Sequence, residues 1–311
     1  MEKVRSDNLT AIIALACAGA LWGLTVPLSK LALPWLAPAW LTTARFLIAA
    51  PILAVAGRRG LREALSLPVL AAGALGFGGV LVLQNAGLAR TSVSHAALLV
   101  GAVPVLVALI AAVRGQASRR PMIWLGYLLA LVGIGLVAGA GGGGASGQGD
   151  LLVFASAVLS AGFIYAQPRL LGDRDPAAVT AVQFTAGIFV SLPLALLTEP
   201  APTLTASPGA LAAVISLGLL GTVAPFWLFA YGQSKVSAQM AGAYVNLEPV
   251  VGAAVGWAAF GNPASTIQLL GAAGVLLGIG LSGLPRQGAE LTPAREEESR
   301  PPGRPPCLAG V

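Results

Sequence analysis

The sequence predicts an all-α integral membrane protein whose ten transmembrane helices form two inverted five-helix repeats. Of the 311 residues, 56% are hydrophobic and only 10% are charged, whereas ordinary soluble domains carry roughly 25% charged residues. Ten apolar blocks follow one another along the chain, and an offset of 145 residues aligns the second half with the first. A water-soluble fold of this length would need more polar side chains to cover its surface. We therefore expect a lipid bilayer as its surroundings.

Each apolar block is long enough to cross a bilayer as a helix, because a hydrocarbon layer about 30 Å thick requires roughly 20 apolar residues. Strands of a membrane barrel would alternate polar and apolar residues, and the blocks do not. The first block exceeds the roughly 7 to 15 apolar residues of a secretory signal, so we expect it to remain as an anchor. The ten predicted spans are 10–31, 38–56, 67–88, 92–113, 121–139, 151–168, 177–197, 210–232, 236–258 and 265–284.

The basic residues predict the orientation, because Lys and Arg in short loops are retained in the cytoplasm. A cytoplasmic N-terminus places all 18 Lys and Arg on that side except Lys30, Arg90 and the intramembrane Arg45. We expect both termini to be cytoplasmic and the protein to lie in the inner (plasma) membrane of a bacterium. The net charge of +6 does not indicate nucleic-acid binding, because the cations are scattered between apolar blocks.

The chain divides into four predicted segments. Residues 1–140 form the first five-helix repeat, 141–150 a Gly-rich external linker, and 151–284 the second repeat. The composition of the linker suits a flexible connection. Residues 285–311 are rich in Pro, Glu and Arg, and we expect a disordered cytoplasmic tail because such a segment cannot bury a core.

The internal repeat suggests a mechanism. The offset aligns 133–136 with 278–281, both Gly-Ile-Gly-Leu, and Pro104 with Pro249. If each repeat holds five helices, the second half enters the membrane from the opposite side, and two such halves can exchange roles in alternating access. A proline inside a span removes a backbone hydrogen bond. Pro104 and Pro249 are therefore candidate hinges, with plain packing kinks as the alternative.

Three ionisable residues lie well inside the predicted spans: Arg45, His95 and Glu248. A charge near the middle of a bilayer costs at least about 2.5–3.5 kcal/mol. Glu248 is the first candidate for binding a proton or a substrate amine, with a structural hydrogen-bonding role as the alternative. His95 can titrate near neutral pH and act as a gate, or lie at the interface. Arg45 can hold a substrate carboxylate or anchor its helix against backbone carbonyls.

Polar side chains on the ninth span predict a cavity beside it. Gln239 and Asn246 share one face of that helix, and Tyr244 and Glu248 are neighbours on another. Aromatic rings can contact a substrate amine through cation–π attraction, although Trp and Tyr also form interfacial belts. The further substrate-binding candidates are Trp22, Gln84, Tyr165, Trp227 and Tyr231.

Other function classes find little support in the sequence. The single histidine excludes most clusters with metal-ligand spacing, and no span places Ser or Cys beside a base for nucleophilic catalysis. No Gly-x-x-x-x-Gly-Lys motif indicates ATP binding. We therefore expect no enzymatic activity, no metal and no cofactor. A polytopic membrane enzyme and a passive channel remain alternatives, although a channel does not require inverted halves.

Several segments resemble a known family. Leu-Trp-Gly at 21–23, Ala-Arg-Phe-Leu-Ile-Ala at 44–49 and Leu-Glu-Pro-Val at 247–250 are similar to motifs of the drug/metabolite transporter superfamily, EamA-like branch. The resemblance covers about residues 10–284. It implies a secondary transporter with a central cavity that exports amino acids or related metabolites, with multidrug or cationic-compound efflux as the alternative. The implied partners are a small-molecule substrate, the bilayer and, as candidate coupling ions, protons.

One departure from the family pattern concerns two loops. Members of the resembled family often carry a Gly-Glu pair after the fourth and ninth spans, whereas this sequence has Gln116 and Asn262 after the corresponding glycines. An amide at these positions can keep a hydrogen bond without the charge.

Overall fold

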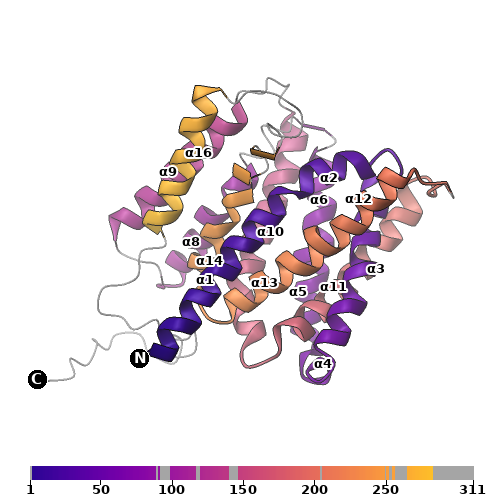
Figure 1. Cartoon of the computed structure of the whole chain (residues 1–311), viewed down its shortest axis with the longest axis horizontal. Coiled ribbons are helices and arrows are strands. Elements are labelled where there is room, and N and C mark those ends of the chain that lie inside the picture. The colour runs from indigo at the N-terminus through magenta and orange to yellow at the C-terminus, as the bar shows by residue number, and fades with distance from the viewer. Residues whose placement is uncertain are drawn as a thin grey trace, which may run out of the picture.

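The computed structural model describes residues 2–88, 90–91, 99–116, 120–139, 146–203, 205–248, 250–251, 254–255 and 265–282. Over these residues the fold is helical and contains no β-strand, as the sequence predicts (Figure 1). The first half holds α1 (Glu2–Gly23), α2 (Thr25–Ala32), α3 (Pro38–Ala56), α4 (Leu61–Ala64), α5 (Leu67–Gly73), η1 (Ala74–Gly79), α6 (Val80–Leu88), α8 (Val103–Val113) and α9 (Pro121–Gly139). The second half holds α10 (Gly147–Leu171), α11 (Pro176–Thr198), α12 (Pro208–Gly218), η2 (Leu219–Val223), α13 (Ala224–Gln233), α14 (Ala238–Val245) and α16 (Thr266–Ser282).

Within the described ranges, five helices are long and apolar enough to cross a membrane: Pro38–Ala56, Leu67–Gln84, Gly147–Leu171, Pro176–Thr198 and Pro208–Gln233. Shorter apolar helices cover Leu9–Gly23, Leu99–Val113, Pro121–Leu136 and Thr266–Ser282. Much of the second part of the predicted ninth span lies outside the described residues. The count of ten spans therefore stays a prediction.

The helix ends follow local sequence signals. α11 begins at Pro176, where the missing N–H is harmless, and the Asp175 carboxylate accepts a hydrogen bond from the Ala178 N–H at 2.9 Å. Ser146 caps α10 by accepting from the Gly149 N–H at 3.3 Å. Because α10 begins at Gly147, the last residues of the predicted linker 141–150 are helical, and 141–145 lie outside the described residues.

The predicted first span, 10–31, is interrupted. α1 ends at Gly23, and α2 begins at Thr25. The Thr25 hydroxyl donates to the Trp22 carbonyl at 2.7 Å, and such side-chain bonds compete with the helical ladder. The interruption places Trp22 and Thr25 at a junction between two helices.

The fourth span is also interrupted. The sequence predicts Pro104 in the middle of a helix, and the structure places it elsewhere. The chain turns at Ala102, whose N–H bonds to the Leu99 carbonyl at 3.2 Å, and Pro104 falls in the first turn of α8. A proline is tolerated there because the first turn needs no N–H. The span is thus broken ahead of the proline, whereas the other predicted hinge, Pro249, lies outside the described residues.

Two π-helical segments occupy equivalent places in the two halves. η1 begins at Ala74 and η2 begins at Leu219, which the 145-residue offset superimposes. In η2 the Thr222 hydroxyl donates to the Leu217 carbonyl at 2.8 Å. Single π turns inside helices often occur at functional sites.

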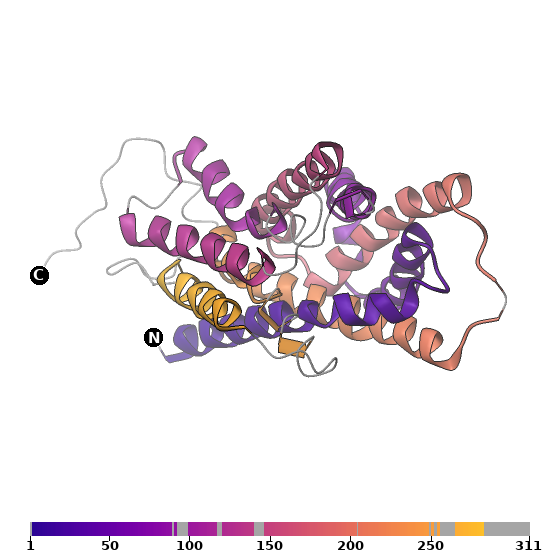
Figure 2. The same ribbon diagram turned by 90° about the horizontal axis from the view of Figure 1, so that it is seen from above.

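The contacts between helices repeat when the offset is applied. α3 contacts α11, and α9 contacts α16; α6 contacts α10, while the corresponding α13 contacts α1. A Cβ atom added at Gly133 would lie 2.5 Å from the Gly271 carbonyl oxygen, so α9 and α16 approach through their backbones. Figure 2 shows this pair at one end of the longest axis and the α11–α12 connection at the other.

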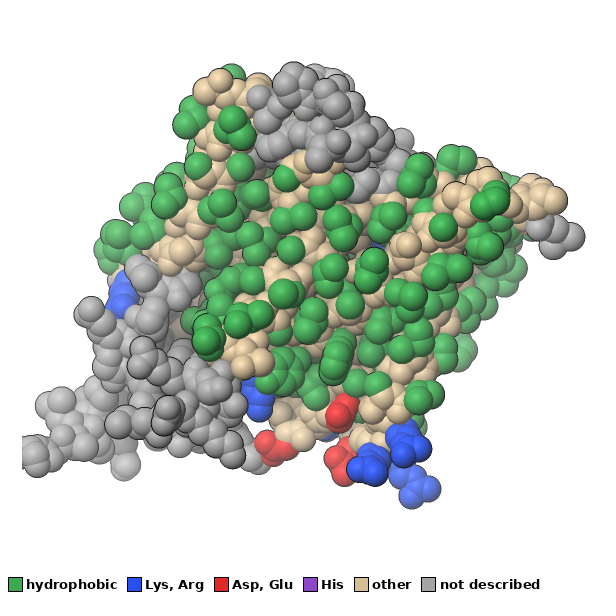
Figure 3. All heavy atoms as spheres, in the orientation of Figure 1, with side chains coloured by type: hydrophobic (Ala, Val, Ile, Leu, Met, Phe, Trp, Pro, Cys, Tyr) green, Lys and Arg blue, Asp and Glu red, His purple; other side chains and the backbone are tan. Residues whose placement is uncertain are grey.

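The equivalent helices α1 and α10 run in opposite directions. The N-terminus and α4 lie at the same end of the bundle (Figure 1). α10 finishes beside α4, because Arg174, just beyond it, donates from Nε to the Glu63 carbonyl at 2.9 Å. In Figure 3, hydrophobic side chains cover the visible flank, and acidic and basic side chains gather at the α4 end.

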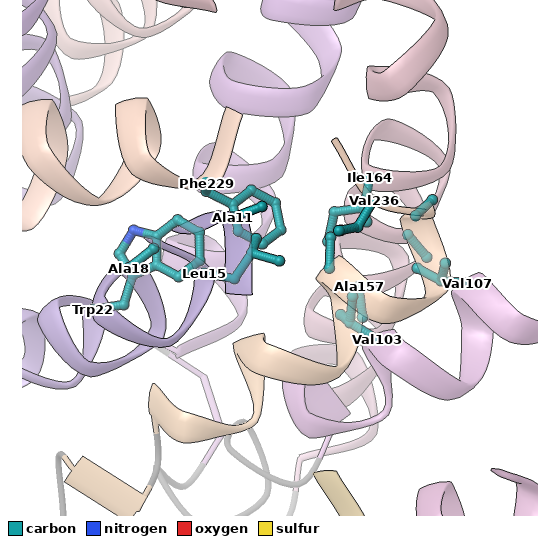
Figure 4. Packing of buried hydrophobic residues seen from close by; sticks show 13 residues of the cluster. Ala11, Leu15, Ala18, Trp22, Val103, Val107, Ala157, Ile164, Phe229 and Val236 are labelled. Carbon is teal, nitrogen blue, oxygen red and sulfur yellow. The ribbon is translucent and has the colours of Figure 1, made fainter. Parts of the chain in front are cut away.

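Aromatic and aliphatic side chains join the two halves in the core. Leu15 and Trp22 of α1 share a cluster with Phe229 of α13 and Ile164 of α10 (Figure 4). A second cluster surrounds Phe77 of η1, whose ring contacts four others edge-on at centroid distances of 4.8–6.2 Å. The partners of Phe77 are Phe46, Phe163, Phe184 and Phe226.

Candidate functional site

Arg45 connects α3 in the first half to η2 in the second. Its Nε donates to the Thr222 hydroxyl oxygen at 2.9 Å, and its Nη2 donates to the Gly221 carbonyl at 2.9 Å. Pro225 explains why that carbonyl is free, since a proline lacks the N–H that would bond to the residue four positions earlier. The Thr222 hydroxyl donates its hydrogen to the Leu217 carbonyl, so the hydroxyl oxygen is the acceptor for Arg45. The guanidinium is therefore held between two fixed acceptors.

Glu248 supplies the opposite charge from the segment after α14. The chain turns at Asn246, and Leu247 and Glu248 are again helical. The Glu248 carboxylate and the Arg45 guanidinium interact electrostatically inside the bundle, and both side chains keep some accessible surface. This pairing offsets part of the cost of placing either charge within a span.

Thr25 lies near the Arg45 guanidinium, and Trp22 packs against two rings of α13. A Cβ atom at Gly221 would be 3.1 Å from Thr25 Cγ2 and 3.8 Å from Arg45 Nη2. The Trp22 ring contacts Phe226 at 4.9 Å and Phe229 at 5.0 Å between centroids. Its side chain is 9% exposed, and the buried Nε1 has no hydrogen-bond partner in the described structure. Buried donors normally find an acceptor, so this indole N–H is available to a ligand.

The end of α14 is pressed against α1. A Cβ atom at Gly19 would lie 2.3 Å from the Tyr244 carbonyl oxygen and 3.1 Å from Leu247 Cβ, so only glycine fits there. Because Gly19 and Trp22 are three positions apart on α1, they share a face. This close approach brings the segment that carries Glu248 to the face of α1 that carries Trp22.

Tyr165 takes part in a different contact between the halves. Its hydroxyl donates to Gln116 Oε1 at 2.5 Å, and the Arg169 guanidinium lies 5.4 Å from the centre of its ring. Gln116 thus acts as an acceptor at one of the two loop positions where the sequence departs from the resembled family. The other, Asn262, lies outside the described residues.

The remaining candidates are dispersed. Gln84 on α6, Tyr231 on α13 and Gln239 on α14 are half-buried. Tyr244 packs between the α1 cluster and a cluster on α9 and α16. Asn246 is 3% exposed, and its Oδ1 has no partner among the described residues.

Two predicted site residues are not placed with the others. Trp227 is 45% exposed on the outer surface, because one step along α13 from Phe226 turns a side chain about 100° around the axis. His95 lies outside the described residues.

Sequence reasoning missed the groups that hold Arg45. Gly221, Thr222 and Pro225 are not among the predicted site residues, because the predicted hinges are prolines that recur in both halves, and the offset pairs Pro225 with Val80. The usable signal was a lone proline in the eighth span, four residues after a glycine.

Two buried amide contacts were also not predicted. Gln167 and Gln183 exchange two hydrogen bonds of 3.0 and 2.8 Å. Gln233 donates to the Ile164 carbonyl at 3.0 Å, an acceptor that Pro168 leaves free. Over the described residues, no group of three or more His, Cys, Asp and Glu could hold a metal ion.

An all-helical bundle with an apolar flank and an opposed charge pair between its halves has the features of a membrane transporter. The chain matches the EamA-like transporter family over residues 9–139 and again over 147–284. It therefore belongs to that family, as the resemblance to the drug/metabolite transporter superfamily predicts, and it is an integral membrane protein.

Curated relatives are similar over most of their length. The chain is 29% identical over 302 residues to a probable terminal-alkyne amino-acid exporter of Streptantibioticus cattleyicolor, covering 94% of this chain and 98% of that one. It is 27% identical over 252 residues to an uncharacterized transporter of Archaeoglobus fulgidus, covering 78% of this chain and 86% of that one. A solved crystal structure superposes with a TM-score of 0.77 at 22% identity, covering 91% and 96% of the two chains, and this likeness concerns the fold alone.

Proposed function

We propose that this protein exports an amino acid or a closely related metabolite across a bacterial inner membrane by alternating access. The observation that carries the proposal is that Arg45, held by Thr222 and Gly221 of the second half, and Glu248 place opposite charges inside the bundle. An α-amino acid carries the complementary charges on adjacent groups. The relative from Streptantibioticus cattleyicolor, named as an amino-acid exporter, supports the same substrate class.

The proposed architecture is ten helices in two inverted halves with both termini in the cytoplasm. The opposite directions of α1 and α10 and the reciprocal helix contacts support the inversion. The charged side chains at the α4 end support that end as the cytoplasmic one. Two inverted halves can open to each compartment in turn.

Arg45 and Glu248 bind different groups of the substrate. Arg45 spends two of its five N–H groups on Thr222 and Gly221. The remaining donors can bind a substrate carboxylate. Glu248 binds the substrate amine or, when the substrate is absent, a proton; this competition couples export to proton entry. Trp22 and Phe226 contact the apolar side chain.

Counterflow in proteoliposomes tests this assignment. Vesicles preloaded with an unlabelled amino acid should take up the labelled compound through the wild-type protein without any gradient of protons. Uptake driven by an imposed pH difference is measured in parallel. Glu248→Gln is compared with Glu63→Gln, which makes the same chemical change on the exposed helix α4.

Each outcome separates two roles of Glu248. Loss of both activities in Glu248→Gln indicates substrate binding, whereas retained counterflow with lost pH-driven uptake indicates proton coupling. Glu63→Gln should behave as wild type in both assays. Wild-type behaviour of Glu248→Gln would remove Glu248 from the mechanism, and absence of counterflow with any amino acid would overturn the proposed function.

A further inference from the structure

We propose that Arg45 determines the charge selectivity of this transporter, admitting substrates that carry an anionic group beside their amine and rejecting simple monocations. The inference rests on the proposed function for the location of the site. It also assigns to Arg45 the discrimination between amino acids and cationic compounds as substrates.

The geometry fixes the position of the Arg45 charge. The two acceptors of its guanidinium are the backbone carbonyl of Gly221 and the hydroxyl of Thr222, both in η2. Because one acceptor is backbone and the other is a short side chain, both keep their places and hold the guanidinium in position. A guanidinium also remains protonated in proteins, so its positive charge is present whichever ligand occupies the site.

The local charge balance then favours a zwitterion. The charges of Arg45 and Glu248 sum to zero. A bound amino acid adds no net charge, because its carboxylate pairs with Arg45 and its amine pairs with Glu248. A monocation pairs with Glu248 but leaves Arg45 uncompensated beside a second positive group. An opposite charge within about 4–6 Å favours an ionised group by a factor of roughly 10 to 1,000, whereas a like charge disfavours it; only the zwitterion offers Arg45 an opposite charge.

The repeat shows that packing does not require an arginine at this place. The offset of 145 residues pairs Arg45 with Val190 and Glu248 with Val103. Val190 covers η1 much as Arg45 covers η2: a Cβ atom at Gly78 would lie 2.6 Å from Val190 Cβ. A valine therefore fills the equivalent interface in the other half. Neither Arg45 nor Glu248 has a charged counterpart at the equivalent position of the other half, which points to a role beyond holding the helices together.

The test compares an amino acid with its methyl ester, which keeps the amine and the side chain and loses the anionic group. The amino acid that gives the fastest wild-type counterflow is used. In wild-type protein the ester should inhibit this counterflow at least tenfold more weakly than the acid itself. This measurement needs no variant and so does not depend on the folding of one.

Two variants then separate charge from structure. Arg45→Gln should lower counterflow of the acid. It should also shift the ratio of inhibition by the ester to inhibition by the acid at least tenfold towards the ester. Thr222→Val removes the hydroxyl that accepts from Arg45 and donates to Leu217 but keeps the Arg45 charge, so it should lower the rate of counterflow while keeping the wild-type ratio of ester to acid inhibition. Size-exclusion profiles of both variants check their folding.

Specific results would overturn the selectivity role. Equal inhibition of the wild-type protein by ester and acid would show that the site does not require the anionic group. Equal loss of acid and ester counterflow in Arg45→Gln would make Arg45 a structural anchor only. Both results leave amino-acid transport intact as the function, whereas a wild-type protein inactive with every amino acid removes the proposed function and this inference with it.

Discussion

Gly278→Ala should weaken the α9–α16 pair by steric overlap. An alanine Cβ there would lie 2.5 Å from the Gly126 carbonyl oxygen, 2.7 Å from the Ala130 nitrogen and 2.8 Å from Ala130 Cβ. Two of these atoms are backbone, so the helices must separate. Such overpacking costs about 1–3 kcal/mol.

Gly280→Ala is the matched control on the same helix. No atom lies within 4 Å of a Cβ added at Gly280. Replacing a helical glycine by alanine favours the helix by about 0.8–1.0 kcal/mol in both variants. This contribution cancels in the comparison, and the difference between the variants isolates the overlap.

Thermal unfolding of the purified proteins in detergent measures the difference. With roughly 2–4 °C per kcal/mol for chains of 150–250 residues, Gly278→Ala should melt about 2–12 °C below Gly280→Ala. Equal melting temperatures would show that α9 and α16 are not in backbone contact, and the packing argument would be wrong.

Three further substitutions test individual contacts. Gln233→Leu leaves the buried Ile164 carbonyl without its partner and should destabilise the protein by about 1–3 kcal/mol; an unchanged melting temperature would contradict this hydrogen bond. Tyr165→Phe removes the bond to Gln116 and should cost about 0.5–1.5 kcal/mol, which a double-mutant cycle with Gln116→Ala would reveal as a coupling between the two positions. Trp227→Leu changes an outward side chain and should alter stability by less than about 0.5 kcal/mol with counterflow near the wild-type rate, so a loss of transport would place Trp227 in the site after all.

Long apolar helices were the most predictable part of the fold. The predicted spans 38–56, 67–88 and 121–139 coincide with α3, with the α5–η1–α6 helix and with α9. Their apolar composition makes these helices predictable, since a segment in lipid can pair its backbone N–H and C=O groups within itself only as a helix. The interruptions at Leu24 and Ala102 were not predicted, because they depend on local competition for a few carbonyl groups rather than on hydrophobicity.

The candidate site was predictable only in part. Arg45 and Glu248 stand out in the sequence because ionisable groups inside spans are rare and costly. Their partners do not stand out. Thr222, a common residue in any span, matters because Arg45 reaches it from 177 positions away in the chain.

The sequence by itself determined that this chain belongs in a membrane, is helical and is duplicated, because solvent matching and backbone hydrogen bonding act on each segment separately. Only the tertiary structure decided which carbonyl Arg45 occupies, that Glu248 interacts with it, and that Trp227 faces outward. These facts follow from how helices from the two halves pack, and side-chain contacts between distant segments leave no local pattern in the sequence.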